Sequence, residues 1–137
     1  MNGETLTAFQ SAEDGTMETG SKNLRERTTN YALRIIQLYV ALPKTTQAQL
    51  IGKQALRSGT SVGAHHREAH RAKSNADFVN KIEGALQELD ETAYWLELLA
   101  KAGIVKPTRL QPLVEETEQL IAIFVASTKR VKSKMND

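Results

Sequence analysis

The sequence predicts an all-α protein, an up-down-up-down antiparallel four-helix bundle. Three observations lead to this fold class. Apolar side chains recur three and four residues apart in four successive segments, which is typical of amphipathic helices. Short links with proline, glycine or capping residues separate these segments. No window alternates strictly between apolar and polar residues, so no sheet is expected.

The first two helices are predicted between about residues 22 and 72. In the first, apolar positions step by four and three residues from Leu24 to Leu42, and Pro43 ends the helix. The second opens at Thr46, with Gln49 at the spacing of a capping box. Small residues dominate its predicted core stripe, so a neighbouring helix must approach closely. The stripe consists of Ile51, Ala55, Ser58, Val62, His65, Ala69 and Ala72.

The third and fourth helices carry stronger apolar stripes. The third begins near Ser74, a candidate N-cap, with Asp77 near the positive end of the helix dipole, and it stops at Gly103. The fourth opens at Thr108, with Gln111 again at capping-box spacing. The predicted core positions are Phe78, Ile82, Ala85, Leu89, Thr92, Leu96 and Leu99 in the third helix, and Leu110, Leu113, Thr117, Leu120, Phe124 and Val131 in the fourth.

The chain has 137 residues, enough for one domain with its own core. We expect a flexible acidic tail over residues 1–20, the bundle over 21–132 and a flexible end over 133–137. Four of the 16 acidic side chains and none of the 18 basic ones lie in residues 1–20, which leaves the remainder with a net charge of +6. A mildly basic body permits a polyanionic partner.

Cysteine is absent, which excludes disulfides, a thiolate metal site and a thiol nucleophile. No run of about 18 apolar residues is present, so no membrane-spanning helix is expected. The N-terminal stretch lacks a basic region followed by an apolar one, as a signal peptide requires. These features predict a cytoplasmic protein with no membrane partner.

All three histidines lie in the stretch "HHREAH", residues 65–70. His66 and His70 stand one helical turn apart, but a zinc-protease helix needs glutamate directly after the first histidine, and Arg67 occupies that place. No acid stands three residues before a histidine, so a di-iron bundle is rejected. Ser58 and Ser61 fit close packing better than nucleophilic catalysis. No catalytic residue, metal, cofactor or small-molecule substrate is predicted, and the chain is not expected to be an enzyme.

The histidines have different predicted roles. His65 falls on the core stripe, where a hydrogen-bonded polar residue can fix helix register. His66 and His70 lie off that stripe, beside Arg67 and Arg71, on a basic surface that could contact phosphates. A solvated helix face explains the same residues, so both readings stay open. The predicted nucleic-acid contacts are Arg57, His66, Arg67, His70, Arg71, Lys73, Lys129, Arg130 and Lys132.

Four residues predict a subunit interface. Gly59 and Gly63 each cost about 1 kcal/mol relative to alanine inside a helix, which favours a role in close helix approach within the bundle and between subunits. Tyr94 and Leu98 make the third helix apolar on more than one side, which is typical of a helix buried against a second subunit. Partial exposure of Tyr94 or Leu98 to solvent would explain the same pattern, so this alternative stays open beside the homo-oligomer that we expect.

A combination of spacings extends from Gln54 to Leu99. Its members are Arg57, Ser58, Ser61, Val62 and Ala64, then Arg67, Glu68 and Ala69, then Ser74, Asp77 and Phe78, then Glu88, Glu91, Thr92, Trp95, Leu96, Leu98 and Leu99. With these residues the chain resembles the small four-helix-bundle proteins of the 23S rRNA intervening-sequence family, over about residues 22–131. His65 and His66 depart from the pattern, because the family often has asparagine and then an aromatic residue or isoleucine there.

The resemblance implies a homopentamer around a central axis and no known enzymatic activity. The family is also similar to the accessory variability protein of diversity-generating retroelements, a basic pentameric bundle that works with a reverse transcriptase and nucleic acid. The function hypothesis is a non-enzymatic oligomeric bundle that associates with RNA, DNA or a nucleic-acid-processing protein through a basic surface. The alternative is a protein–protein adaptor or self-assembly module without nucleic-acid binding.

Overall fold

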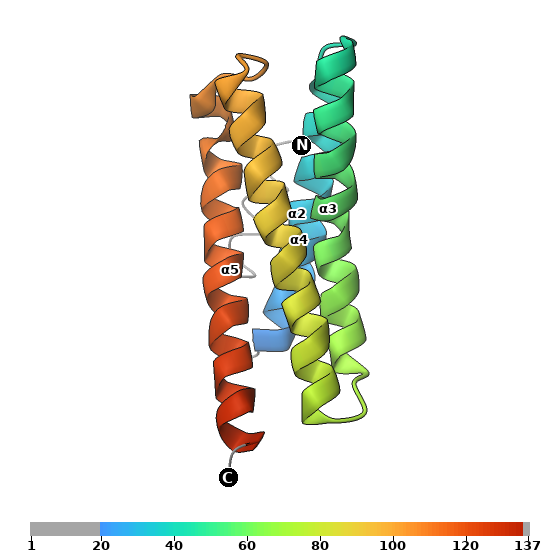
Figure 1. The fold of residues 1–137 in the computed structure, drawn as a ribbon, viewed down its shortest axis with the longest axis vertical. Coiled ribbons are helices and arrows are strands. Elements are labelled where there is room, and N and C mark those ends of the chain that lie inside the picture. The colour runs from blue at the N-terminus through green and yellow to red at the C-terminus, as the bar shows by residue number, and fades with distance from the viewer. Residues whose placement is uncertain (1–19, 136–137) are drawn as a thin grey trace.

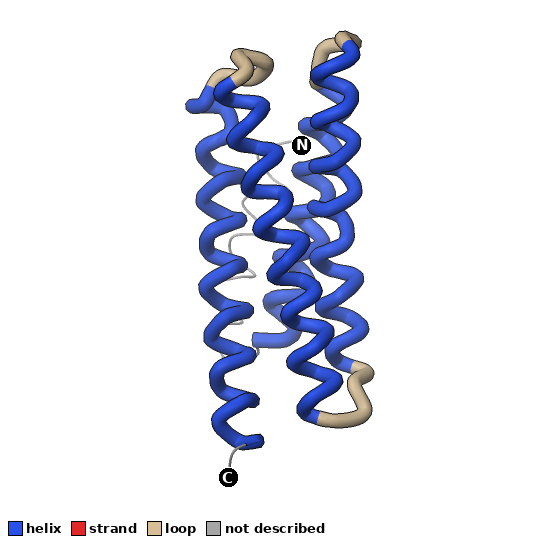
Figure 2. Tube along the Cα trace, in the orientation of Figure 1, coloured by secondary structure: helices blue, strands red, loops and turns tan. Residues whose placement is uncertain are grey.

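A computed structural model describes residues 20–135 and folds them into four helices (Figure 1). The helices are α2 (Gly20–Ala41), α3 (Thr46–His70), α4 (Asn75–Lys101) and α5 (Pro107–Met135). Consecutive helices run antiparallel, and the described range contains no strand (Figure 2), so the predicted all-α bundle is confirmed. The predicted acidic tail lies outside the described residues apart from Gly20. Helix α5 continues past residue 132, where the sequence predicts the bundle to end.

The polar caps fix where α3 and α4 begin. Helix α3 is capped by Thr45, whose Oγ1 accepts a hydrogen bond from the Ala48 N–H at 3.3 Å, so the prediction that Thr46 starts a capping box is wrong. The Gln49 side chain instead donates to the backbone carbonyl of Pro43. The predicted cap of α4 is confirmed, because the Asp77 N–H donates to Ser74 Oγ at 3.0 Å.

The turn between α4 and α5 ends on a left-handed glycine. Gly103 has φ +73°, and its N–H donates to the Ala100 carbonyl at 3.1 Å. The N–H of Ile104 donates to the Leu99 carbonyl at 3.0 Å, which completes a Schellman motif as the sequence predicts. Helix α5 begins at Pro107 and not at Thr108, because proline fits the first helical turn, where its missing N–H is not needed.

The core confirms the predicted stripes, but on α3 only in part. The largest fully buried apolar side chains are Tyr31, Phe124, Ile35, Ile82, Leu89, Leu96, Leu99, Leu120 and Val62. On α3 the predicted core residues Ala55, Ser58, Val62 and Ala69 are buried, which confirms that part of the stripe. Gly52 and His66 are buried in place of Ile51 and His65, which are half-buried, so the predicted stripe is rotated by one residue at these two places. The close approach of α2 is what buries Gly52 and Gly59 on α3.

Gly59 and Gly63 make that close approach possible within one chain. A Cβ added to Gly59 would lie 2.8 Å from Cγ1 of Ile35, and one on Gly63 would lie 3.1 Å from Oγ1 of Thr28. The contact at Gly59 would force a shift of Ile35, and the contact at Gly63 would press on Thr28, so both glycines serve the packing of α2 on α3. The close helix approach that the sequence predicts within the bundle at these glycines is therefore the contact with α2.

A layer of buried hydroxyl groups joins all four helices near their middle. The Ser58 and Thr92 hydroxyls lie 2.7 Å apart between α3 and α4, and those of Tyr31 and Thr117 lie 2.6 Å apart between α2 and α5. Both threonines donate their own proton to the backbone carbonyl four residues earlier. Ser58 and Tyr31 are therefore the donors across the two helix seams. Burial raises the pKa of Tyr31 to about 12.

The seam between α2 and α5 depends on polar contacts. These two helices approach each other over a short stretch only, whereas every other neighbouring pair packs along its length. Buried Arg27 donates from Nη2 to Glu116 Oε1 at 2.6 Å and to Gln119 Oε1 at 2.9 Å. A buried charge is tolerated only when it is paired in this way. The seam is thus closed in its middle.

Replacing the central threonine tests the hydroxyl layer. Thr92→Val keeps the side-chain volume but leaves the Ser58 donor without its partner, so the free energy of unfolding should fall by about 1–3 kcal/mol. Thr60→Val is the matched control, because Thr60 Oγ1 donates only to carbonyls of its own helix. Urea unfolding of both variants measures the difference. Equal losses would show that the link between helices contributes nothing.

Candidate nucleic-acid interface

Basic residues from two distant segments gather at one end of the bundle. Helices α3 and α5 both finish at this end, where α4 begins (Figure 1). The antiparallel topology therefore places the predicted contacts at residues 67–73 and 129–132 at the same end of the bundle, on either side of the start of α4. The exposed basic side chains there, called the basic end below, are Arg67, Arg71, Lys73, Lys129, Arg130 and Lys132.

The sequence analysis missed two members of the same end. Exposed Arg25 lies near the start of α2 and contributes to the positive potential at His66. Exposed Lys134 follows one turn after Arg130 on α5. Antiparallel topology was the signal that could have found Arg25, because the start of the first helix must lie beside the end of the second.

Few acidic groups neutralise the basic end. Lys132 Nζ lies 3.1 Å from Glu83 Oε2, and both side chains are about half exposed. An exposed ion pair of this kind is weak, so Lys132 can exchange its partner for a phosphate. The guanidinium of Arg67 donates to Thr29 Oγ1 at 3.3 Å. The remaining cations of the basic end form no ion pair with another residue in 20–135.

Arg57 does not belong to the basic end. It lies 13 residues before the end of α3, which is about 20 Å along the helix axis. Its Nη2 lies 3.1 Å from Glu91 Oε2, and its Nη1 lies 3.5 Å from Glu88 Oε1. The hydrogen bond to Glu91 and the charge of Glu88 raise the pKa of Arg57. Two carboxylates of α4 already pair with Arg57 away from the basic end, and its predicted phosphate contact stays a prediction.

His66 is buried too deeply to contact a phosphate, because only 3% of the residue is exposed. The centre of its ring lies 5.8 Å from that of Phe124 and 4.7 Å from that of His70, which it meets edge-on. The prediction of a surface role for His66 is therefore wrong. The error follows from the rotated stripe on α3, which also placed His65 in the core. His65 is half-buried beside Glu88, with 4.0 Å between Nε2 and Oε2.

The environment of His66 favours its neutral form. Burial is the largest cause, and the positive charges of His70, Arg67 and Arg25 add to it, so the pKa falls from 6.5 to about 4. Its Nε2 lies 3.2 Å from Nε2 of His70, a hydrogen bond that needs one ring nitrogen to lack a proton. The described residues hold no group of three or more His, Asp or Glu side chains placed to bind a metal ion.

The spacings shared with the intervening-sequence proteins meet across the seam between α3 and α4. Arg57 pairs with Glu88 and Glu91, and its neighbour Ser58 bonds Thr92, so the α3 half of the pattern binds the α4 half. These pattern residues therefore take part in the packing of α3 on α4.

The sequence analysis did not predict the exposed apolar face of α2. Leu33, Ile36 and Val40 are 47%, 40% and 69% exposed, at helical spacing on the side away from the core. Of the predicted interface residues on α4, Tyr94 is 51% exposed and Leu98 is half-buried. The missed signal was the second stripe, three and four residues apart, beside the core stripe of α2. None of helices α2–α5 is long and apolar enough to cross a membrane.

The fold and surfaces define a small helical-bundle protein with one basic end and an exposed apolar face. A model of the 23S rRNA-intervening sequence protein family matches residues 22–126, and the chain belongs to this family. A crystal structure of a protein with unknown function from the S23 ribosomal protein family of Bacteroides thetaiotaomicron is similar, with 36% identity and a TM-score of 0.73. The similarity covers 77% of this chain and 97% of that one. No curated protein matches the chain.

His66 makes stability depend on pH. The fold lowers its pKa from the ordinary value of 6.5 to about 4. The contribution of neutral His66 to the free energy of unfolding is therefore complete above pH 6.5 and is lost as the pH falls toward 4. The expected loss reaches about 3 kcal/mol. His66→Leu should flatten this slope in urea unfolding between pH 7 and 4, whereas Thr92→Val, destabilised elsewhere, should keep it. An unchanged slope in His66→Leu would contradict the assignment.

Proposed function

We propose that this protein is a non-enzymatic, oligomeric helical bundle that binds RNA or DNA through its basic end. The observation that carries the proposal is that α3 and α5 both finish at the same end of the bundle, where exposed cations have few acidic partners (Figure 1). Lysine and arginine on such a surface bind phosphates and release counterions from the nucleic acid. The same end would serve in a cytoplasmic complex with a nucleic-acid-processing protein.

Oligomerisation strengthens a patch that is weak in one copy. The exposed face of Leu33, Ile36 and Val40, together with Tyr94, offers apolar surface for contact between copies. A pentamer, as the family resemblance implies, would repeat the basic end five times around one axis. Linked copies bind a long polyanion with an avidity that a single copy lacks.

The basic end favours backbone recognition over base reading. The side chains that define it are arginine and lysine, and the aromatic rings near it are half-buried Phe78 and fully buried Phe124. Base stacking requires exposed aromatic rings, and sequence readout requires groups that reach base edges. Binding should therefore depend strongly on salt and weakly on sequence.

Removing two arginines tests the basic end. Arg67→Ala/Arg71→Ala should weaken binding of a labelled structured RNA at least tenfold at low salt and reduce the slope of log affinity against log salt by about 1–2. Fluorescence anisotropy over a salt series measures both. The matched control is Lys44→Ala/Lys53→Ala, which removes the same charge from exposed positions away from the basic end.

The outcomes separate the alternatives clearly. Loss in the arginine variant with retention in the lysine control supports the proposal. Equal loss in both variants would mean that only net charge matters, and no binding at low salt would reject nucleic-acid binding.

A second candidate function is a protein–protein adaptor or self-assembly module without nucleic-acid binding. The exposed apolar face of α2 favours it, because three large apolar side chains at helical spacing are unusual on a solvated helix. Under this alternative the basic end is a solvated surface and the α2 face holds the partner.

Charge on the α2 face tests assembly. Ile36→Glu/Val40→Glu should shift the protein toward monomer in sedimentation velocity, because two carboxylates would be desolvated in the contact. Gln87→Glu/Ala126→Glu adds the same charge at exposed positions of α4 and α5 and should leave the assembly intact. An unchanged oligomer in the α2 variant would place the interface elsewhere.

A further inference from the structure

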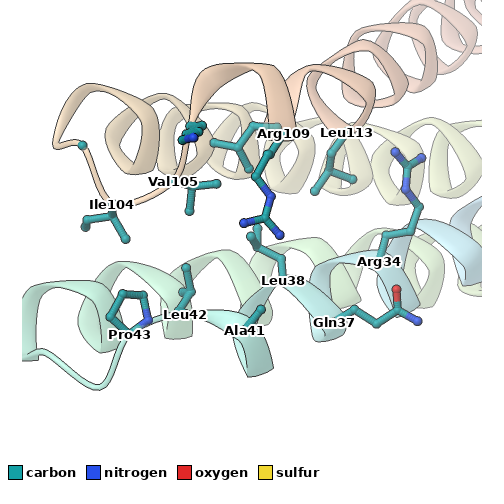
Figure 3. Close-up of a pocket in the computed structure, with 13 residues that line it drawn as sticks. Arg34, Gln37, Leu38, Ala41, Leu42, Pro43, Ile104, Val105, Arg109 and Leu113 are labelled. Carbon is teal, nitrogen blue, oxygen red and sulfur yellow. The ribbon is translucent and has the colours of Figure 1, made fainter.

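A cleft opens between α2 and α5 at the end of the bundle opposite the basic end (Figure 3). Its volume is about 600 Å³, within the range of small-molecule sites. Six apolar side chains form much of its lining, namely Leu38 and Leu42 of α2, Ile104 and Val105 of the turn, and Leu110 and Leu113 of α5. The cleft exists because the polar contacts of Arg27 and Tyr31 close the seam only in its middle.

Cations line this apolar cleft without acidic neighbours. Arg109 extends from α5 toward Leu38, and Arg34 extends from α2 toward α5, so the two guanidinium groups enter from opposite walls (Figure 3). Lys106 lies at the rim, and no aspartate or glutamate contributes to the lining. None of the three cations forms an ion pair with a described residue.

We propose that this cleft binds an amphipathic organic anion, a molecule with one carboxylate or phosphate head and an apolar body. The guanidinium groups of Arg34 and Arg109 present paired N–H donors to an oxyanion. The leucine and valine side chains cover the apolar body and remove it from water. The start of the 29-residue helix α5 adds further positive potential at the rim.

Charge favours this occupant over the α2 face of a second copy. The exposed apolar face formed by Leu33, Ile36 and Val40 carries no acid to match Arg34 and Arg109. A cleft of this volume has room for a chain of about ten carbons. The sequence predicts no small-molecule substrate, and the cleft is proposed to hold its ligand without turnover. The proposal is independent of nucleic-acid binding, because the basic end lies at the other end of the bundle.

Calorimetric titration of the full chain with decanoate tests the cleft. Decanoate should bind once per chain with a Kd on the order of 10–100 μM. Decyltrimethylammonium, which has the same apolar chain and the opposite charge, should bind at least tenfold more weakly. Decyl phosphate distinguishes the two head groups, and binding of either anion supports the proposal. Absence of binding by both anions at 1 mM, or equal affinity for the cation, overturns it.

Variants locate the binding. Arg34→Gln/Arg109→Gln should weaken decanoate at least tenfold, and Ala41→Trp, which fills the cleft without changing its charge, should do the same. Lys129→Gln/Arg130→Gln at the basic end is the matched control and should retain decanoate affinity while RNA affinity falls. Equal decanoate binding by all variants overturns the site. If decanoate fails and Ala41→Trp dissociates the oligomer, the cleft is a contact between copies and the ligand proposal is rejected.

Discussion

The buried hydroxyl layer sets the register of this bundle. A four-helix core of small and aliphatic side chains can slide by a turn at little cost, but a buried hydroxyl donor without a partner costs about 1–3 kcal/mol. Ser58 with Thr92 and Tyr31 with Thr117 each bridge two helices, so one register satisfies all of them. The positions of the basic end and of the α2–α5 cleft both follow from that register, since each is built from residues of different helices.

Most of the fold could be predicted because the core-facing stripes of three of the four helices consist mainly of large apolar residues. The stripe of α3 could be predicted only in part, because the approach of α2 buries Gly52 and Gly59. A search for hydrophobic residues selects Ile51 as a core position in preference to the glycine beside it. For the same reason, the prediction placed His65 in the core and His66 on the surface, whereas His66 is the buried one. The cations at the ends of α3 and α5 could be predicted from composition and topology. The pairing of Arg57 could not, because it depends on which carboxylates of α4 lie opposite.

The paired residues in the middle of the family pattern lie apart from the candidate binding surfaces, whereas Arg67 belongs both to the pattern and to the basic end. Arg57, Ser58, Glu88, Glu91 and Thr92 are engaged with one another across the seam of α3 and α4. These contacts hold the fold together, and the candidate binding surfaces at the two ends of the bundle are built from other residues. One end is basic and open to solvent, and the other is an apolar cleft with arginines in its walls. The exposed apolar face of α2 is the surface proposed for contact between copies.

Ultraviolet crosslinking of the full chain to a short structured RNA, followed by mass spectrometry of the crosslinked peptides, tests the central claim most directly. The account predicts crosslinks in residues 67–73 and 129–134, which lose intensity as salt is raised. Crosslinks confined to the middle of α3 around Arg57, or to the α2 face, would contradict it, because those surfaces are assigned to helix packing and to contacts between copies.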